Sequence, residues 1–220
     1  MLINVEPVEC ASKMTRYRVR YEKKGLVKYV SHLDLINYFS RLVSRCNIDI
    51  EYTQGFNRKP KFEFGPALQL GIESDCEYFN MFVNSEIDPQ ETMDKLNEFG
   101  LEELKILEVK PGLERKISKT VDGFLFEVII KSMEEDVELD FNIRESVDYA
   151  FLVDEKIVKP EFVDKFEFLE DTDKTIRFLW RTKFLKGAFI SPKRIERLDD
   201  FKDVYVDYKK IENYWIDGAN

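Results

Sequence analysis

Apolar and polar residues alternate in the first stretch of the chain that has a regular pattern, residues 15–21. Tyr17, Val19 and Tyr21 occupy every second position, and this period of two is typical of a strand with one buried face. The positions between them carry cations, and we expect these on the outer face of the strand: Arg16, Arg18 and Arg20.

The pattern changes to helical spacing at residue 31. Ser31 and Asp34 have the spacing of a capping box, with Asp in place of the usual Glu, and predict a helix start. The apolar positions that follow define one buried stripe: Leu35, Ile36, Phe39, Leu42, Val43 and Cys46. Polar residues share the opposite face of the helix: Asp34, Tyr38, Arg41 and Arg45.

The rest of the first 110 residues predicts several strands and a second helix. Asp88 and Pro89 begin this helix and Gly100 ends it. Its expected inward residues are Met93, Leu96 and Phe99. Short apolar or alternating runs predict strands at 48–53, 61–64, 67–71, 76–83 and 103–109, with the third and fourth joined as a hairpin. This order of strands and helices is that of a ferredoxin-like split βαβ unit.

Residues 110–120 are polar and interrupted, and they mark a boundary. Beyond them we expect strands at 124–130, 163–169, 175–184 and 204–208, with helices at 142–152 and 191–198. The expected fold class is α+β, with two ferredoxin-like (split βαβ) units in tandem and antiparallel sheets. The expected domains are a lead-in at 1–14, a first unit at 15–110 and a degenerate second unit at 121–217.

Charge is distributed unevenly along the chain. The whole sequence has 34 Lys/Arg against 43 Asp/Glu, a net charge of −9. Residues 16–62 reverse this balance with 11 Lys/Arg against 4 Asp/Glu, and residues 174–197 have 8 Lys/Arg against Glu196 alone. Two basic islands in an acidic protein favour binding of RNA or another polyanion. The alternative is that they are solvated faces of strands and helices.

Other classes of protein have no support in the sequence. No apolar run approaches the ~20 residues of a membrane span, and the start of the chain lacks the pattern of a signal peptide. Cys10, Cys46 and Cys76 are too widely spaced for a paired zinc signature and suit a reducing compartment. We therefore expect a cytoplasmic protein without a metal site, a cofactor or a membrane partner.

The first basic island supplies most of the residues that we expect to contact RNA. Cations neutralise phosphates, and exposed aromatic rings stack on unpaired bases. The predicted RNA-binding residues are Arg18, Tyr38, Arg41, Arg45, Phe56, Arg58, Lys59 and Lys61.

His32 is the single histidine of the chain and a candidate general base or phosphate ligand at a helix start. The alternative is a structural role in the capping turn, and the helix dipole at this end disfavours its charged form. No residue is assigned as catalytic beyond this candidate. Residues 54–57 predict a sharp turn, because Gly permits positive φ and Asn stabilises its own loop. The residues expected to order these loops are Ser31, His32, Asp34, Gly55 and Asn57.

Several short motifs together resemble one family. They comprise Tyr29–Leu35 (YVSHLDL), Arg41, Arg45, Gln54–Asn57 (QGFN), Pro60, and Gly71–Ser74 followed by Glu77 and Tyr78. Over roughly residues 15–190 the chain resembles the radical-SAM-associated proteins of DUF2344, a family of unsettled biochemistry. Members occur alone or fused behind a cobalamin-binding radical SAM enzyme, often encoded near ribosomal-protein and ribonuclease genes. This chain departs from the usual GFNPHP by having Arg58 and Lys59, which removes a second histidine.

The resemblance implies an accessory role in RNA or ribosome modification. The chain lacks the three closely spaced cysteines of a radical SAM iron–sulfur site, so the radical enzyme would be a separate partner. The leading hypothesis is an RNA-binding accessory protein that presents ribosomal or transfer RNA to that enzyme. Two alternatives stay open: a metal-independent endoribonuclease that uses His32, and a protein-docking module without RNA contact.

Overall fold

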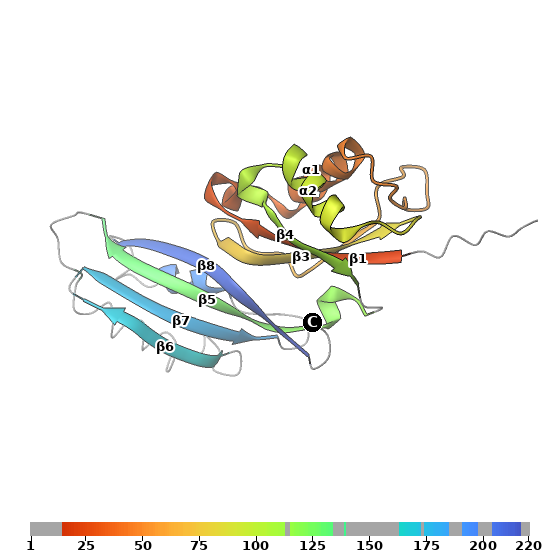
Figure 1. Cartoon of the computed structure of the whole chain (residues 1–220). Coiled ribbons are helices and arrows are strands. Elements are labelled where there is room, and N and C mark those ends of the chain that lie inside the picture. Colours follow the sequence, from red (N-terminus) through yellow and green to blue (C-terminus); the bar gives the residue numbers. More distant parts are fainter. Residues whose placement is uncertain are drawn as a thin grey trace, which may run out of the picture.

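The strands of the chain form one long twisted sheet. The computed structural model describes residues 15–112, 115–133, 139, 163–172, 174–184, 191–197 and 204–216. Within them eight strands join in the order β4-β1-β3-β8-β5-β7-β6, and β2 pairs with β3 beside this path. Figure 1 shows two α-helices over one end of the sheet and β5 to β8 extending away from them.

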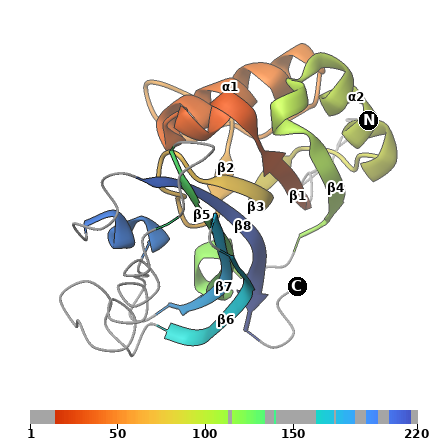
Figure 2. The same cartoon turned by 90° about the vertical axis from the view of Figure 1, so that its left-hand side faces the viewer.

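The first half has the predicted succession of elements along the chain: strand, helix, strands, helix and strand. Its elements are β1 (Thr15–Lys23), α1 (His32–Arg45), β2 (Phe62–Phe64), β3 (Glu73–Val83), α2 (Pro89–Phe99) and β4 (Ile106–Pro111), with 3₁₀ helices η1 (Gly25–Tyr29) and η2 (Glu102–Leu104). The order β4-β1-β3-β2 is antiparallel throughout, as in a split βαβ unit. Figure 2 shows α1 and α2 together above β1, β3 and β4.

The second half is built from long strands. Its elements are η3 (Ile117–Lys119), β5 (Val121–Ser132), β6 (Val163–Asp171), β7 (Thr175–Lys183), η5 (Pro192–Arg197) and β8 (Val204–Trp215). Both α-helices of the described residues lie in the first half, so two tandem ferredoxin-like units are not confirmed. The helix predicted at 191–198 is a 3₁₀ helix over residues 192–197. The helix predicted at 142–152 and the lead-in predicted at 1–14 lie outside the described residues.

Two strand predictions in the first half are wrong. Residues 48–53 form only isolated bridges, from Ile50 to Val83 and from Tyr52 to Pro60, because the backbone changes its partner from Phe82 at Glu51 to Lys59 at Thr53. The predicted hairpin of 67–71 with 76–83 does not form. Gly71 bends the chain with φ +82° and donates its N–H to the Lys28 carbonyl instead, and β2 takes the edge of β3.

The helices begin and end where their capping residues predict. The Asp88 side chain accepts a hydrogen bond from the Glu91 N–H at 2.7 Å, and Pro89 occupies the first turn of α2. In α1 the expected stripe is buried except at Ile36, which is only partly buried. In α2 Leu96 is buried, whereas Phe99, predicted to face inward, is 42% exposed because it ends the helix.

The reverse face of the first sheet is also covered. Arg18 was predicted to face solvent, but it is only 2% exposed. Its guanidinium lies over the Trp215 ring at 5.0 Å, and its Nε donates to the Asn80 side chain at 3.4 Å. The end of β8 therefore covers the face that the alternating pattern assigns to water.

The two halves join where β3 meets β8. The strands pair in parallel through Glu73 with Lys209 and Ser74 with Lys210, and then separate. The Asn213 side chain spans the gap, donating to the Cys76 carbonyl at 2.6 Å and accepting from Lys210 Nζ at 3.3 Å. Lys210 and Glu77 form an ion pair in this gap, and both side chains are buried.

Loss of this buried ion pair should weaken the joint strongly. Removing one partner leaves a buried charge without its counter-ion, so we expect Glu77→Gln to lower the free energy of unfolding by about 3–5 kcal/mol. Lys209→Met removes a neighbouring lysine that pairs with Asp75 at the surface and should cost less than about 1 kcal/mol. Urea unfolding followed by circular dichroism and by tryptophan fluorescence measures both, and equal losses would contradict this assignment.

Candidate nucleic-acid interface

The serine motif fixes the start of α1. Ser31 is the N-cap, and its Oγ accepts the Asp34 N–H at 3.2 Å while donating to the Asp34 carboxylate at 2.7 Å. Ser31 is thus confirmed as the N-cap, whereas the Asp34 carboxylate accepts from the Ser31 hydroxyl and not from the Ser31 N–H of a full capping box. The first turn of α1 therefore has a fixed conformation.

His32 packs against the sheet at this helix start. Its ring lies edge-on to the Phe64 ring at 5.3 Å and is half-buried. Burial lowers the pKa of the imidazole, Lys23 lowers it further and Glu77 opposes the shift, so the ring is neutral at pH 7. Among the described residues no side chain hydrogen-bonds to this ring. The geometry therefore favours a packing role over general acid–base chemistry.

Residues 52–60 are here named the 52–60 loop. Its two ends are hydrogen-bonded to each other through residues 51–53 and 59–61, which are named the neck of the loop. Thr53 N–H donates to the Lys59 carbonyl at 2.8 Å, and Lys59 N–H donates to Thr53 Oγ1 at 3.1 Å. Lys61 N–H donates to the Glu51 carbonyl at 2.7 Å, which ties the neck to the sheet. Gly55 has φ +130°, a conformation that other residues rarely adopt. The predicted turn is therefore present and ordered at its base.

The tip of the 52–60 loop exposes an aromatic ring between polar residues. Phe56 is fully exposed, and Arg58 and Lys59 beside it are exposed as well. No acidic residue occurs between positions 52 and 60. In the part of the chain that the structure describes, no carboxylate pairs with Arg58 or Lys59, and the Asn57 side chain has no hydrogen-bond partner. The tip thus combines an unburied ring with two uncompensated cations.

Other predicted RNA-binding residues are engaged within the fold. Lys61 Nζ pairs with both Glu51 oxygens at 3.0 Å. The Tyr38 hydroxyl accepts the Leu101 N–H at 2.8 Å, and burial raises the pKa of this phenol. Arg45 Nη1 donates to the Phe99 carbonyl at 3.2 Å. Tyr38 and Arg45 therefore tie α1 to the end of α2.

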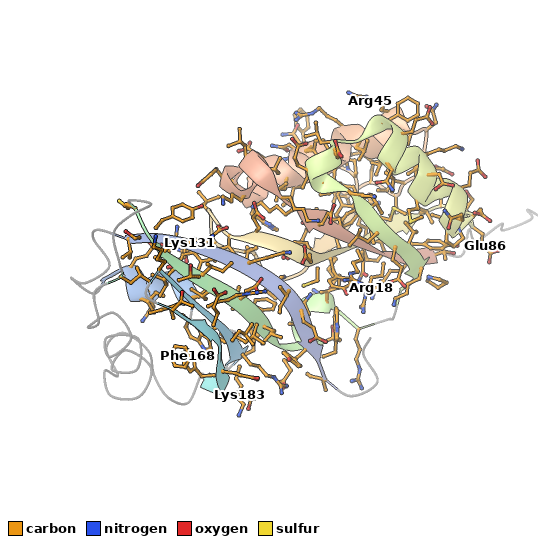
Figure 3. All side chains as sticks on the ribbon, turned by 60° about the vertical axis from the view of Figure 1, so that its left-hand side comes forward. Arg18, Arg45, Glu86, Lys131, Phe168 and Lys183 are labelled. Atoms are coloured by element: carbon orange, nitrogen blue, oxygen red, sulfur yellow. The ribbon has the colours of Figure 1, made fainter. Side chains whose placement is uncertain are left out.

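The predicted RNA-binding residues do not form one surface. Figure 3 shows Arg45 on the helical side of the first sheet and Arg18 on the opposite side, toward the second half. Arg41 is exposed on α1, four residues before Arg45. Figure 1 shows the chain between α1 and β2 at the end of the first half where α1 ends. Arg41 and the 52–60 loop thus belong to the same end, whereas Arg18 is buried on the opposite face of the sheet.

The second basic island is largely neutralised by carboxylates on neighbouring strands. Arg177 pairs with Glu127 across β7 and β5. Asp164 of β6 pairs with Arg181 at 2.9 Å and with Lys183 at 2.6 Å. Figure 3 shows Lys183 far from Arg45, so the two islands do not meet there. These pairs favour the alternative interpretation of this island as a solvated sheet face.

The sequence analysis missed a buried polar group beneath the start of α1. Lys23, Glu77 and Lys210 are all buried, and Lys23 Nζ donates to the Val30 carbonyl at 3.3 Å. Burial lowers the pKa of the Lys23 ammonium, and Glu77 opposes this. The alternating pattern does indicate that Lys23 is buried, because Lys23 lies two positions after Tyr21, which faces inward.

The sequence matches the family model described as an uncharacterised protein conserved in bacteria, DUF2344, over residues 16–159. The chain belongs to the DUF2344 family. The motifs at the start of α1 and in the 52–60 loop both lie inside the matched region. The match confirms the family resemblance, while the radical SAM association is a separate expectation. No curated protein matches the chain in sequence.

Three solved structures resemble the chain at low similarity. The chain is 8% identical to a chain of the archaeal box H/ACA sRNP Nop10-Cbf5 complex, with a TM-score of 0.46, covering 90% of this chain and 47% of that one. A chain of a Cbf5-Nop10-Gar1 complex is 9% identical, with a TM-score of 0.43 and coverages of 90% and 48%. An unknown protein from Galdieria sulphuraria is 10% identical, with a TM-score of 0.28 and coverages of 91% and 100%. The chain spans about half the length of the first two.

None of the described helices has the length and apolar character needed to cross a membrane. The described residues also contain no group of three or more His, Cys, Asp or Glu side chains placed to hold a metal ion.

Titration of His32 tests its packed position. Because folding favours the neutral ring, the contribution of His32 to stability is fully present above its unfolded pKa of about 6.5 and is lost as the pH falls from there through the lowered native pKa. We expect an imidazole pKa below 6.5 in the native protein and near 6.5 in urea, followed by NMR of the single histidine. Lys23→Met should raise the native value, since the Lys23 charge lowers it, and Lys24→Met should leave it unchanged. A native pKa above 6.5 would be inconsistent with this packing.

Proposed function

We propose that this protein binds RNA through the 52–60 loop and serves as an accessory protein in RNA modification. The observation that carries the proposal is the fully exposed Phe56 beside Arg58 and Lys59 on an ordered neck. A soluble domain gains nothing for its own stability from such a ring, since the ring buries no surface. Exposed aromatics with adjacent cations are the usual means of binding unpaired nucleotides.

The contacts divide between two kinds of group. Phe56 would stack on an unpaired base, and Arg58 and Lys59 would neutralise the phosphates on either side of it. Arg41 adds an exposed cation at the same end of the first half. These groups give affinity without selecting a sequence, because every base offers a face for stacking.

The partner and the place of action come from the family resemblance. The chain would hold ribosomal or transfer RNA for a separate radical SAM enzyme, because it lacks the cysteines of an iron–sulfur site. A cytoplasmic location is part of the same proposal. We also propose that the second half is a degenerate copy of the first unit, since its strand order β8-β5-β7-β6 repeats the order β4-β1-β3-β2.

Substitution of the loop tip tests RNA binding directly. We expect Phe56→Ala to weaken binding of single-stranded RNA about 5- to 100-fold, the effect of one lost stacking contact. Arg58→Ala with Lys59→Ala should reduce the slope of log affinity against log salt by roughly 1.4, since each phosphate contact on a single strand contributes about 0.7. Fluorescence anisotropy with labelled RNA over a salt series measures both quantities.

A matched control removes two exposed lysines elsewhere. Lys119→Ala with Lys131→Ala changes the net charge equally but lies outside the loop, and it should leave most of the affinity and slope intact. Equal effects of the two double variants would show that only net charge matters. No RNA binding by the unmodified protein at low salt would remove the proposal.

A second candidate function, protein docking, is favoured by exposed apolar residues around the start of α1. Leu26, Tyr29, Leu33 and Leu70 are 83%, 60%, 61% and 47% exposed. Leu26 and Tyr29 lie three residues apart on a 3₁₀ helix and so share a side. Tyr29 also lies next to Gly71, which follows Leu70. Grouped apolar exposure of this kind is typical of a protein contact.

The docking function has its own test. If a radical SAM enzyme binds this patch, Leu26→Ser or Leu33→Ser should weaken the purified complex about tenfold or more in calorimetry, because each leucine loses its burial in the interface. Leu101→Ser removes an exposed leucine outside the patch and should have no effect. Unchanged affinity in both patch variants would exclude this surface.

A further inference from the structure

A small polar notch opens on the reverse face of the sheet, where β3 and β8 separate. Its volume is about 170 Å³. The residues that line it come from β1, β3 and β8: Arg20, Cys76, Tyr78, Ile211, Glu212, Asn213 and Trp215. None of the residues predicted to bind RNA lines it. The volume is below the ~300 Å³ of typical ligand pockets, which restricts an occupant to about one ring system.

The backbone creates the notch by an irregularity in β8. Leu125 of β5 pairs with Glu212 and Phe126 pairs with Lys210, so Ile211 is an extra residue in β8. Such a bulge bends the strand and is common beside functional sites. Past Ser74, β3 no longer pairs with β8, and Asn213 bridges the gap with both ends of its amide engaged.

The notch is lined by both a hydrogen-bond donor, Arg20, and a hydrogen-bond acceptor, Glu212. Arg20 and Tyr78 are cross-strand neighbours and so share this face. Arg20 Nη2 donates to the Asp75 carbonyl at 3.3 Å, while its Nε has no hydrogen-bond acceptor among the described residues. Glu212 lines the notch and is exposed, and its carboxylate can only accept hydrogen bonds. The rings of Tyr78 and Trp215 meet edge-to-face at 5.0 Å and form an aromatic wall.

The Cys76 thiol does not supply a nucleophile. Burial raises its pKa to about 11, so the thiol is neutral at pH 7. The notch is therefore suited to binding and not to covalent chemistry.

We propose that this notch binds one guanine base. Guanine has two adjacent N–H donors on one edge, which match the Glu212 carboxylate, and two acceptors on another, which match an arginine such as Arg20. The aromatic wall of Tyr78 and Trp215 provides contact for the planar base. A simple anion fits less well, because the Glu212 carboxylate would repel it.

The base has two sources with the same chemistry. It is either a free guanine nucleotide or an unpaired guanine of the RNA that the 52–60 loop would hold. The RNA source rests on the proposed function, whereas the free nucleotide does not. Guanosine monophosphate and single-stranded uridine oligomers with or without one guanine separate these sources.

Trp215 provides the measurement. The chain has two tryptophans, and Trp180 is fully buried in the core of the second half. We expect guanosine monophosphate to change the tryptophan fluorescence saturably, and the change to be absent in Trp215→Phe. Glu212→Gln should weaken the binding about tenfold, because the amide loses the negative charge and one of the two acceptor oxygens that would pair with the guanine N–H donors. Glu167→Gln, an exposed glutamate of β6, is the matched control and should bind normally.

The outcomes distinguish the two proposals. Phe56→Ala should lose RNA affinity and keep guanosine monophosphate binding, so failure of the loop leaves the notch testable. No fluorescence change with guanosine monophosphate at millimolar concentration, together with no preference for the guanine-containing oligomer, overturns the guanine site. An equal response to the adenosine, cytidine and uridine monophosphates overturns it as well.

Discussion

The buried ion pair between Glu77 and Lys210 is the interaction on which the structure of this protein depends most. β3 carries the joint, because it pairs with β1 and β2 of the first half and with β8 of the second. Its direct pairing with β8 covers only two residues on each strand. The ion pair and the Asn213 amide extend this short contact into the region where the strands separate. Two charges buried without each other would oppose folding, so their pairing specifies how the halves meet.

This joint also determines which surfaces remain for function. It brings the end of β8 under the first sheet, where Trp215 covers Arg18 and forms the wall of the small notch. The 52–60 loop lies outside both cores and contributes no buried side chain from its tip. The core is therefore complete without Phe56, and the loop is free to contact a ligand. Stability and the proposed RNA contact reside in different residues.

Local patterns in the sequence were enough to predict the elements of the first half but not how they are covered. The period of two before residue 22 and the cap at Ser31 depend on neighbours in the chain, and β1 and α1 formed as expected. The burial of Arg18 depends on Trp215, almost two hundred residues later, which no local pattern reveals. Tyr38 was predicted to stack on RNA because it lies on a polar helix face, but α2 packs there and engages it. The turn at Gly55 was predictable because it is local, and the exposure of Phe56 was visible only in the structure.

The central claim is that RNA contacts the tip of the 52–60 loop. Ultraviolet cross-linking of the full chain to uridine-rich single-stranded RNA, followed by mass spectrometry of the cross-linked peptides, tests it most directly. The account predicts that the dominant cross-link maps to the peptide containing Phe56, and that the second basic island at residues 174–197 is labelled weakly. A dominant cross-link in β7, with the loop peptide unmodified, would contradict the account.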